Sequence, residues 1–229
     1  MRIISGELKG KSINFVKNSN TRPLKDSVRE NIFNILNHSN LMKINIKDSK
    51  ILDLYSGFGS FGIEGISRGA KKVTFVERDN NAINILKENL LKLSILNKSK
   101  VLCDNIENIL NKELNEKFNL FFLDPPFADS QYLKNISLIK KKKIFEKMHI
   151  VIIHREKKKK ENLDKFIKII ETKIYGRSKI IFGKFCCTTF LSKFLNKPKI
   201  IRKIWNFLSC FLVLHNPEVK HAIMSAVHC

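Results

Sequence analysis

The chain has 229 residues, 43% of them hydrophobic, so it is long enough to bury a core and lacks the composition of a disordered polymer. Lys and Arg outnumber Asp and Glu by 43 to 21, and the resulting net charge of +22 favours a polyanionic partner such as nucleic acid. The alternative is that the charge reflects the general composition of the chain, which is rich in Lys, Asn and Ile throughout. No export signal is expected, and the most apolar run near the C-terminus, residues 205–214, is shorter than the roughly 20 residues of a membrane span.

The first part of the chain predicts a short extended unit followed by a helix. Residues 1–23 alternate apolar runs with Gly6 and Gly10, which predicts an N-terminal β-hairpin that carries several basic side chains. Asp26 then begins a helix, because apolar residues recur at helical spacing from Val28 to Leu36.

From Lys50 onward, short apolar runs alternate with helical patterns. The expected strands are residues 51–55, 73–76, 100–103, 118–123 and 149–153, followed by a closing hairpin of residues 167–175 and 179–185. Helices are expected from the glycine-rich loop up to Gly69, from the cap Asp79 onward, and over residues 132–145. This order predicts an α/β fold: a Rossmann-like, seven-stranded, mostly parallel sheet with helices on both faces and its ligand at the carboxyl ends of the strands.

The glycine-rich loop raises a question of charge. Residues 53–62, DLYSGFGSFG, contain the G-x-G-x-x-G spacing that is typical of loops holding the two phosphates of a dinucleotide. Asp53 stands just before the glycines, where a negative charge would repel phosphate. S-adenosyl-L-methionine has no phosphate and carries a sulfonium and an ammonium, so Asp53 favours this cofactor over NAD. The amides of Gly57 to Gly59 would let the backbone approach it closely.

Two further acids follow the next two predicted strands. Glu77 is placed to accept the ribose hydroxyls, as an acid also does in NAD enzymes, and Asp104 is placed to accept a hydrogen bond from the adenine amine. Each alone is equally well read as a helix cap or a solvated turn residue. Together with Asp53 they favour a cationic adenosine cofactor.

The stretch Asp124-Pro-Pro-Phe127 directly follows the most apolar predicted strand. It can be a stiff turn that ends the strand, because proline fixes φ and cannot continue a ladder. It also suits methylation of an exocyclic amine: Asp124 and the Pro125 carbonyl can each accept one N–H and aim the nitrogen lone pair at the methyl group. Phe127 offers a face for an extruded base. Methyl transfer is a direct displacement, so neither a nucleophilic side chain nor a metal is expected.

These residues resemble the RsmD family of methyltransferases over residues 1 to about 187. The resemblance is carried by residues 1–6 (MRIISG), 9–11 (KGK), 21–33 (TRPLKDSVRENIF), 53–70 (DLYSGFGSFGIEGISRGA), 76–79 (VERD), 122–127 (FLDPPF) and 175–176 (YG). The glycine loop and DPPF alone indicate a broader class of nitrogen methyltransferases. The R-P-x-x-D-x-x-R-E run at residues 22–30 narrows the match to this family.

The resemblance implies a class I methyltransferase fold that uses S-adenosyl-L-methionine to methylate the N2 amine of one guanine in 16S ribosomal RNA, on the small ribosomal subunit. Asp124 and Pro125 would activate the amine and Phe127 would pack on the guanine. The cofactor site would comprise Asp53, Tyr55, Gly57, Gly59, Glu77 and Asp104, and the RNA contacts are assigned to Arg2, Lys9, Lys11, Arg22 and Arg29. Arg22 would be either a lid over the pocket or an RNA contact, and the family does not explain the C-terminal tail, residues 188–229.

Other readings stay open. The same chemistry can act on another base or on an amide nitrogen, and a catalytically silent RNA-binding assembly factor would keep the same fold. An NAD-linked oxidoreductase is disfavoured by Asp53. The five cysteines include no C-x-x-C, which predicts reduced thiols in a cytoplasmic protein, and we expect a monomer.

Overall fold

The computed structural model describes residues 1–15, 24–112, 114, 116–159 and 161–186, and residues Met1–Cys186 form one compact unit. Its strands are β1 (Lys50–Leu54), β2 (Lys72–Glu77), β3 (Ser99–Cys103), β4 (Phe118–Leu123), β5 (Phe145–Glu156), β6 (Lys168–Tyr175) and β7 (Ser178–Lys184). Its helices are α1 (Asp26–His38), α2 (Ser60–Ser67), α3 (Asn80–Lys92), α4 (Ile106–Asn111) and α5 (Tyr132–Lys142), with a 3-10 turn at Leu96–Lys98. The predicted tail lies outside the described residues, so its boundary stays a prediction.

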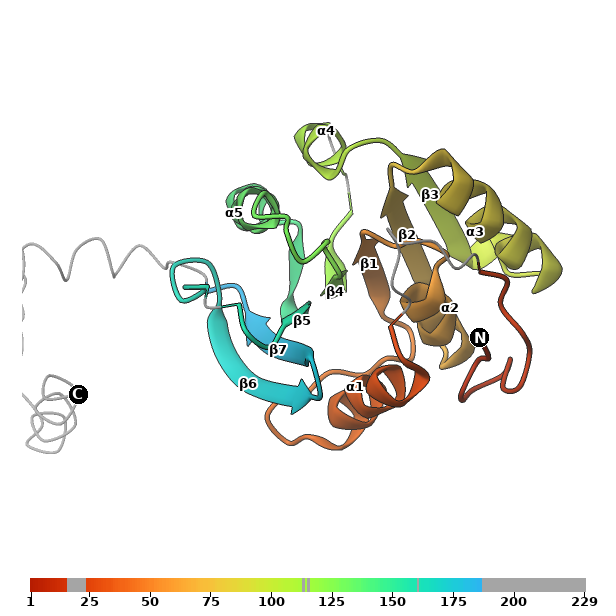
Figure 1. Ribbon diagram of the computed structural model, residues 1–229, viewed down its shortest axis with the longest axis horizontal. Coiled ribbons are helices and arrows are strands. Elements are labelled where there is room, and N and C mark those ends of the chain that lie inside the picture. Colours follow the sequence, from red (N-terminus) through yellow and green to blue (C-terminus); the bar gives the residue numbers. More distant parts are fainter. Residues whose placement is uncertain (16–23, 113, 115, 160, 187–229) are drawn as a thin grey trace, which may run out of the picture. The chain divides into compact units, whose positions relative to one another are not determined.

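The seven strands form one sheet in the order β3-β2-β1-β4-β5-β7-β6 (Figure 1). Strands β1 to β5 run parallel, and β7 is antiparallel to both β5 and β6. The predicted α/β fold with a mostly parallel sheet and a closing hairpin is therefore confirmed. The sequence reading missed two features: β5 begins at Phe145, which pairs with Phe118, and the short helix α4 precedes β4.

The strands bury both faces of the sheet, because successive side chains of a strand point to opposite sides. In β4, Leu120 and Phe122 belong to a core cluster with α1, α2 and α3, whereas Phe121 and Leu123 belong to a second cluster with α4 and α5. Figure 1 shows the two groups of helices on opposite sides of the sheet. A strand covered on both faces reads as a continuous apolar run, which explains why the sequence signal of β4 is so clear.

Helix α3 shows how local sequence fixes an element. The Asp79 carboxylate accepts a hydrogen bond from the Ala82 amide at 2.9 Å and so caps the helix, as predicted. The apolar residues of this segment that recur at helical spacing are all buried, namely Ala82, Ile83, Leu86, Leu90 and Leu93. Within the described residues, no helix is both long and apolar enough to cross a bilayer.

The predicted N-terminal hairpin is present in residues 1–15 as a short antiparallel turn rather than as two regular strands. Ile3 donates its amide to the Lys11 carbonyl at 3.0 Å, Ile13 donates to the Met1 carbonyl at 2.9 Å, and Arg2 and Ser12 form the bridge between the two arms. The pairing stays short because Ile4 and Ser5 donate their amides to the buried Glu64 carboxylate of α2, at 2.9 and 3.1 Å. The segment is therefore docked on α2; its predicted part at residues 16–23 lies outside the described residues.

The docked segment is also tied to the glycine-rich loop by a buried amide. Asn89 of α3 accepts a hydrogen bond from the Asn14 amide at 2.8 Å. Its nitrogen donates to the Asn14 carbonyl at 3.0 Å and to the Phe58 carbonyl of the glycine-rich loop at 3.2 Å. One side chain therefore links α3, the N-terminal segment and the loop that follows β1.

Gly6 provides a test of this docking. Gly6 and Gly10 share a φ of +85°, but a Cβ at Gly6 would lie 1.8 Å from the Ser67 carbonyl oxygen, whereas a Cβ at Gly10 would meet nothing within 4 Å. We expect Gly10→Ala to lose about 1–2 kcal/mol of unfolding free energy from the positive φ alone. Gly6→Ala should lose about 1–3 kcal/mol more from the clash. Urea unfolding of both variants measures the difference, and equal losses would show that the segment is not held against α2.

Candidate active site

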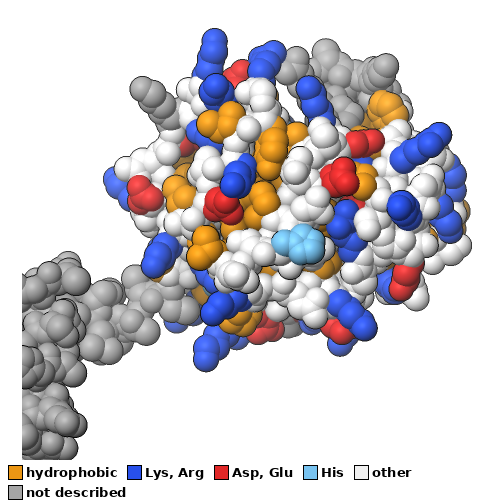
Figure 2. Space-filling model, turned by 90° about the horizontal axis from the view of Figure 1, so that it is seen from below, with side chains coloured by type: hydrophobic (Ala, Val, Ile, Leu, Met, Phe, Trp, Pro, Cys, Tyr) orange, Lys and Arg blue, Asp and Glu red, His pale blue; other side chains and the backbone are white. Residues whose placement is uncertain are grey.

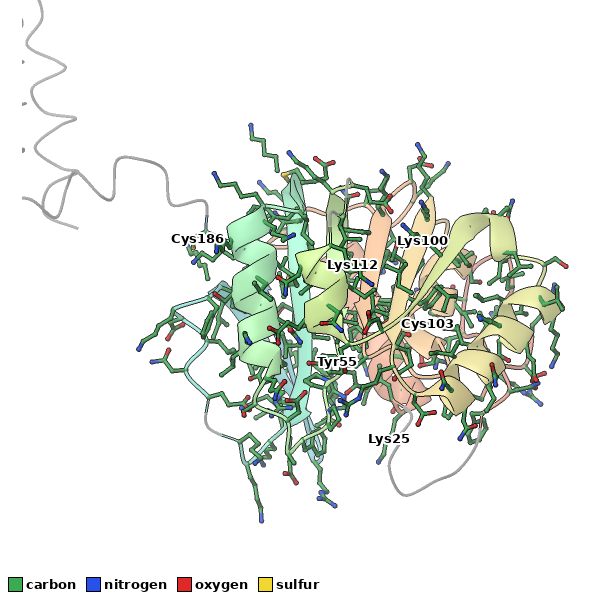
Figure 3. All side chains as sticks on the ribbon, turned by 90° about the horizontal axis from the view of Figure 1, so that it is seen from above. Lys25, Tyr55, Lys100, Cys103, Lys112 and Cys186 are labelled. Atoms are coloured by element: carbon green, nitrogen blue, oxygen red, sulfur yellow. The ribbon has the colours of Figure 1, made fainter. Side chains whose placement is uncertain are left out.

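The parallel register brings the predicted acids to one edge of the sheet. Strands β1, β2, β3 and β4 all end at this edge, so Asp53, Glu77, Asp104 and Asp124, which lie at or next to the ends of these strands, gather there. In Figure 3, Tyr55 after β1 and Cys103 at the end of β3 both lie toward this end of the strands, with Lys100 toward the opposite end. The carboxyl ends of parallel strands are the usual ligand site of such sheets.

The loop after β1 has a backbone that favours small residues. Tyr55, Gly57 and Gly59 have φ values of 60°, 52° and 83°. A Cβ at Gly59 would lie 2.4 Å from Leu86 Cδ1 and would force this side chain to move, in addition to the strain of the positive φ, whereas a Cβ at Gly57 would meet nothing within 4 Å. Space therefore remains in front of Gly57. The Tyr55 hydroxyl accepts a hydrogen bond from Asn135 at 3.0 Å and so joins the loop to α5.

Asp53, in β1, is buried beneath the glycine-rich loop and binds the start of α2. Its side chain is 1% exposed, and one carboxylate oxygen accepts a hydrogen bond from the Gly62 amide at 2.9 Å at the start of α2. The other oxygen, Oδ1, is buried without a hydrogen-bond partner. Burial raises the pKa of Asp53 well above its ordinary value, against the bond from Gly62, and the nearby Asp124 and Glu77 carboxylates raise it further. A cation brought to this edge would relieve the repulsion among these acids.

Glu77 holds the glycine-rich loop and its own turn. Its carboxylate accepts hydrogen bonds from the amides of Gly57 at 2.8 Å, Arg78 at 2.8 Å and Asp79 at 3.0 Å. Each carboxylate oxygen can accept more than one hydrogen bond, so these contacts leave room for ligand hydroxyls. The predicted role of Glu77 toward a ribose stays a prediction.

Asp104 is anchored beside α4. It accepts hydrogen bonds from Asn108 at 2.9 Å and the Asn105 amide at 2.7 Å, and its second oxygen lies 3.2 Å from Lys112 Nζ. These bonds, with that from Asn108 the largest, lower the pKa of Asp104. The carboxylate is therefore ionised and fixed at the end of β3, while its role toward adenine stays a prediction.

The turn Asp124–Phe127 is organised by Arg155, a residue that the sequence reading did not single out. The Arg155 guanidinium is 1% exposed and donates to four backbone carbonyls, those of Pro125, Pro126, Phe127 and Asp129, at 3.4, 3.0, 3.1 and 3.2 Å. The positive charge of Arg155 is balanced by Glu161, whose carboxylate accepts hydrogen bonds from the guanidinium at 2.6 to 3.1 Å. The guanidinium carbon, Cζ, also lies 4.5 Å from the centre of the Tyr132 ring, in a cation–π contact.

His154 is the second residue that the sequence reading missed. Its Nδ1 lies 2.8 Å from Asp124 Oδ1, and its ring packs edge-on against Phe127 at 5.6 Å. Both His154 and Arg155 close the apolar run of β5, next to the Asp124 turn in the sheet. The sequence signal that could have indicated them is a pair of polar residues, His154 and Arg155, directly after the apolar run of residues 150–153. Among the described residues, no group of three or more His, Cys, Asp or Glu side chains is arranged to hold a metal ion.

The predicted RNA contacts divide into two groups. Arg2, Lys9 and Lys11 are exposed on the N-terminal segment, and Lys and Arg side chains stand around the rim of the face shown in Figure 2. The prediction that Arg29 contacts RNA is wrong. Arg29 is 0% exposed, donates to the Arg2 carbonyl at 2.6 Å and pairs with the Asp26 carboxylate at 3.1 Å. It is buried because it holds the N-terminal segment to α1, so it cannot contact RNA here. Arg22 lies outside the described residues.

The sheet order and the site at the carboxyl edge define the class of protein, a class I methyltransferase fold. Its solved relatives include "Putative methyltransferase yhhF" from Escherichia coli, with a TM-score of 0.69 and 25% identity over 81% of this chain and 97% of that one. The precorrin-6y C5,15-methyltransferase of Geobacter metallireducens shares the fold, with a TM-score of 0.53 and 12% identity over 75% of this chain and 94% of that one.

A family model described as conserved hypothetical protein 95 matches residues 1–184. The chain is 36% identical over 156 residues to the ribosomal RNA small subunit methyltransferase D of Buchnera aphidicola subsp. Acyrthosiphon pisum, covering 68% of this chain and 78% of the relative. It is 34% identical over 161 residues to the Haemophilus influenzae protein of the same name, covering 69% of this chain and 80% of the relative. The chain therefore belongs to this family, the RsmD family of methyltransferases, and the predicted resemblance is confirmed.

The buried Asp53 makes a prediction about pH. In the unfolded chain this carboxyl loses its proton near its ordinary pKa of about 3.9, whereas the folded carboxyl keeps the proton to higher pH. Unfolding then releases a proton, so the Asp53 contribution to stability is full below the ordinary pKa and falls as the pH rises, by at most about 1.4 kcal/mol per pH unit. Asp53→Asn keeps the Gly62 bond but cannot ionise. Its stability relative to wild type, from urea unfolding at pH 5, 6 and 7, should therefore increase with pH; a constant difference would contradict the raised pKa.

The ion pair of the buried Arg155 with Glu161 makes a second prediction. Arg155→Met leaves the half-buried Glu161 without its partner and releases four backbone carbonyls, so we expect a loss of about 3–5 kcal/mol of unfolding free energy. Arg177→Met is the matched control, because Arg177 pairs with Glu156 at 3.0 Å but is 72% exposed, and should cost at most about 1 kcal/mol. Chemical unfolding compares the two, and similar losses would contradict the organising role of Arg155.

Proposed function

We propose that the chain is an S-adenosyl-L-methionine-dependent methyltransferase that methylates the exocyclic N2 of a guanine in 16S ribosomal RNA on the small ribosomal subunit. The observation that carries the proposal is the Asp124–Phe127 turn, held by Arg155 at the same edge of the sheet as the glycine-rich loop. The relatives named ribosomal RNA small subunit methyltransferase D support the substrate class. A cytoplasmic monomer acting on ribosomal RNA is part of the proposal.

The turn offers two acceptors for an exocyclic amine. The Asp124 side chain is 21% exposed, and the Pro125 carbonyl receives only a 3.4 Å contact from Arg155, so it keeps a lone pair free. Two acceptors on one nitrogen draw its lone pair out of conjugation with the ring and fix its direction. When the nitrogen gains a methyl group it must lose one proton, and Asp124 is placed to accept it. Phe127, half-buried beside Asp124, provides the stacking surface for the base.

The residues of the glycine-rich loop fit the cofactor. When bound, S-adenosyl-L-methionine supplies a methyl group activated by attachment to a positively charged sulfur. Asp53 has a buried unpartnered oxygen and lies within the field of Asp124 and Glu77, so this edge favours a cationic ligand over a diphosphate. The space in front of Gly57 allows close approach of the backbone. These residues bind and orient; the alignment of methyl and amine supplies most of the rate.

Two other functions predict different outcomes. Methylation of another base or amide nitrogen uses the same turn and is separated from the proposal only by the product. A silent assembly factor would bind ribosomal RNA without transferring methyl groups. The ordered turn favours an enzyme, because a silent factor has no use for a carboxylate aimed at a substrate.

The test is transfer of a labelled methyl group from S-adenosyl-L-methionine to unmodified small ribosomal subunits, with free 16S RNA in parallel. We expect N2-methylguanosine, identified by mass after digestion. Asp124→Asn should reduce kcat at least about 100-fold, because it removes a charged acceptor from the transition state. Calorimetry should show cofactor affinity changed less than about threefold.

Glu107→Gln is the matched control, because this carboxylate pairs with Lys134 at 2.7 Å on the helix α4 and should leave turnover unchanged. Turnover by Asp124→Asn at the wild-type rate would refute the catalytic assignment. Cofactor binding without transfer to any acceptor would favour the silent factor, and another methylated product would redefine the substrate. Stabilisation by NAD but not by S-adenosyl-L-methionine in a thermal shift would refute the cofactor.

A further inference from the structure

His154 lies where three elements of the catalytic edge meet. In the parallel pairing of β4 and β5, Leu123 faces Ile153, so the next residues, Asp124 and His154, are also neighbours. On the other side β7 runs antiparallel, so its first residue, Ser178, returns to the same edge opposite Glu156. The sheet topology therefore delivers a carboxylate, an imidazole and a hydroxyl to one place.

The imidazole of His154 is fully engaged. Its Nδ1 lies 2.8 Å from Asp124 Oδ1, and its Nε2 lies 2.9 Å from Ser178 Oγ. The ring is 7% exposed and meets the Phe127 ring at 82°, with centroids 5.6 Å apart. His154 thus contacts both side chains that the proposed function assigns to the target base.

The partners determine which nitrogen carries hydrogen. An ionised carboxylate only accepts hydrogen bonds, so His154 Nδ1 must be the donor to Asp124. In the neutral ring Nε2 is then the acceptor, and the Ser178 hydroxyl can donate to it. Asp124 Oδ1 therefore already accepts one hydrogen bond, whereas Oδ2 accepts none from the described residues, so Oδ2 is the oxygen with both lone pairs open to an N–H from a substrate.

We propose that His154 is a positioning residue for the methyl transfer. Through Nδ1–H it fixes the Asp124 carboxylate, 2.8 Å away, with Oδ2 toward the substrate. It thereby sets the direction in which the carboxylate meets the amine. The inference rests on the proposed function, because it assigns Asp124 and Phe127 their roles.

A purely structural role makes a different prediction. If His154 only joined β5 to β7, every substitution that removes the Ser178 contact would lower stability, and kcat would follow the folded fraction. A positioning role separates the two nitrogens: the Nδ1 contact controls kcat, and the Nε2 contact controls only packing.

Paired amides separate these roles, because the amide of Asn occupies the place of Nδ1 and that of Gln the place of Nε2. His154→Asn keeps a donor toward Asp124 and loses the Ser178 contact; His154→Gln does the reverse; His154→Leu loses both. We expect His154→Asn and Ser178→Ala to keep kcat within about threefold of wild type. His154→Gln and His154→Leu should lose about 100-fold in kcat, the scale of a misplaced reacting group. KM for the small subunit and cofactor affinity should stay within threefold in all four variants.

Methyl transfer to small subunits, thermal unfolding and cofactor calorimetry are measured on the full chain. Equal kcat for the Asn and Gln variants, or full kcat in a folded Leu variant, would overturn the inference. If the Leu variant does not fold, the Asn and Gln variants decide. A wild-type chain that transfers no methyl group to any acceptor overturns the proposed function itself, whereas an active wild type with an indifferent His154 overturns only the inference.

Discussion

The carboxyl edge of the sheet depends on a buried guanidinium, that of Arg155. A charge taken out of water is costly unless its donors find partners, and Arg155 finds them in Glu161 and in the four carbonyls of Pro125, Pro126, Phe127 and Asp129. The turn is suited to this, because Pro125 and Pro126 have carbonyls but no amide hydrogens and so present an excess of acceptors. Asp124 and Phe127 belong to a turn whose backbone Arg155 holds through its carbonyls, so their positions relative to each other are held with it.

How far the sequence predicted this molecule can be traced to particular residues. The buried run of β4, the Asp79 cap and the glycine-rich loop are local signals, and each predicted its element. The acids at strand ends predicted one edge, because parallel strands share a direction. The sequence could not predict α4, whose six residues leave a short periodic signal, nor the contacts that His154 and Arg155 make. Their partners in the Asp124 turn are 26 to 30 residues away along the chain and meet them only through the pairing of β4 with β5.

Arg29 and Glu64 show why a motif can mislead. Both belong to the stretches that identify the family, and Arg29 was expected to meet RNA. Instead both side chains are 0% exposed, and Glu64 receives the amides of the N-terminal segment while Arg68 lies 2.8 Å from it. A charged residue in a family pattern can therefore serve the fold alone, and only its burial distinguishes this role from substrate contact.

The side-chain amide of Asn89 couples the N-terminal segment to the glycine-rich loop. It makes hydrogen bonds to Asn14 on the basic N-terminal segment and to Phe58 in the glycine-rich loop. Displacing either segment leaves a buried polar group unpaired, at a cost of about 1–3 kcal/mol. The N-terminal segment is thus no detachable appendage, because the side chain that holds it in place also holds the loop after β1, and displacing one of them breaks a hydrogen bond of the residue that supports the other.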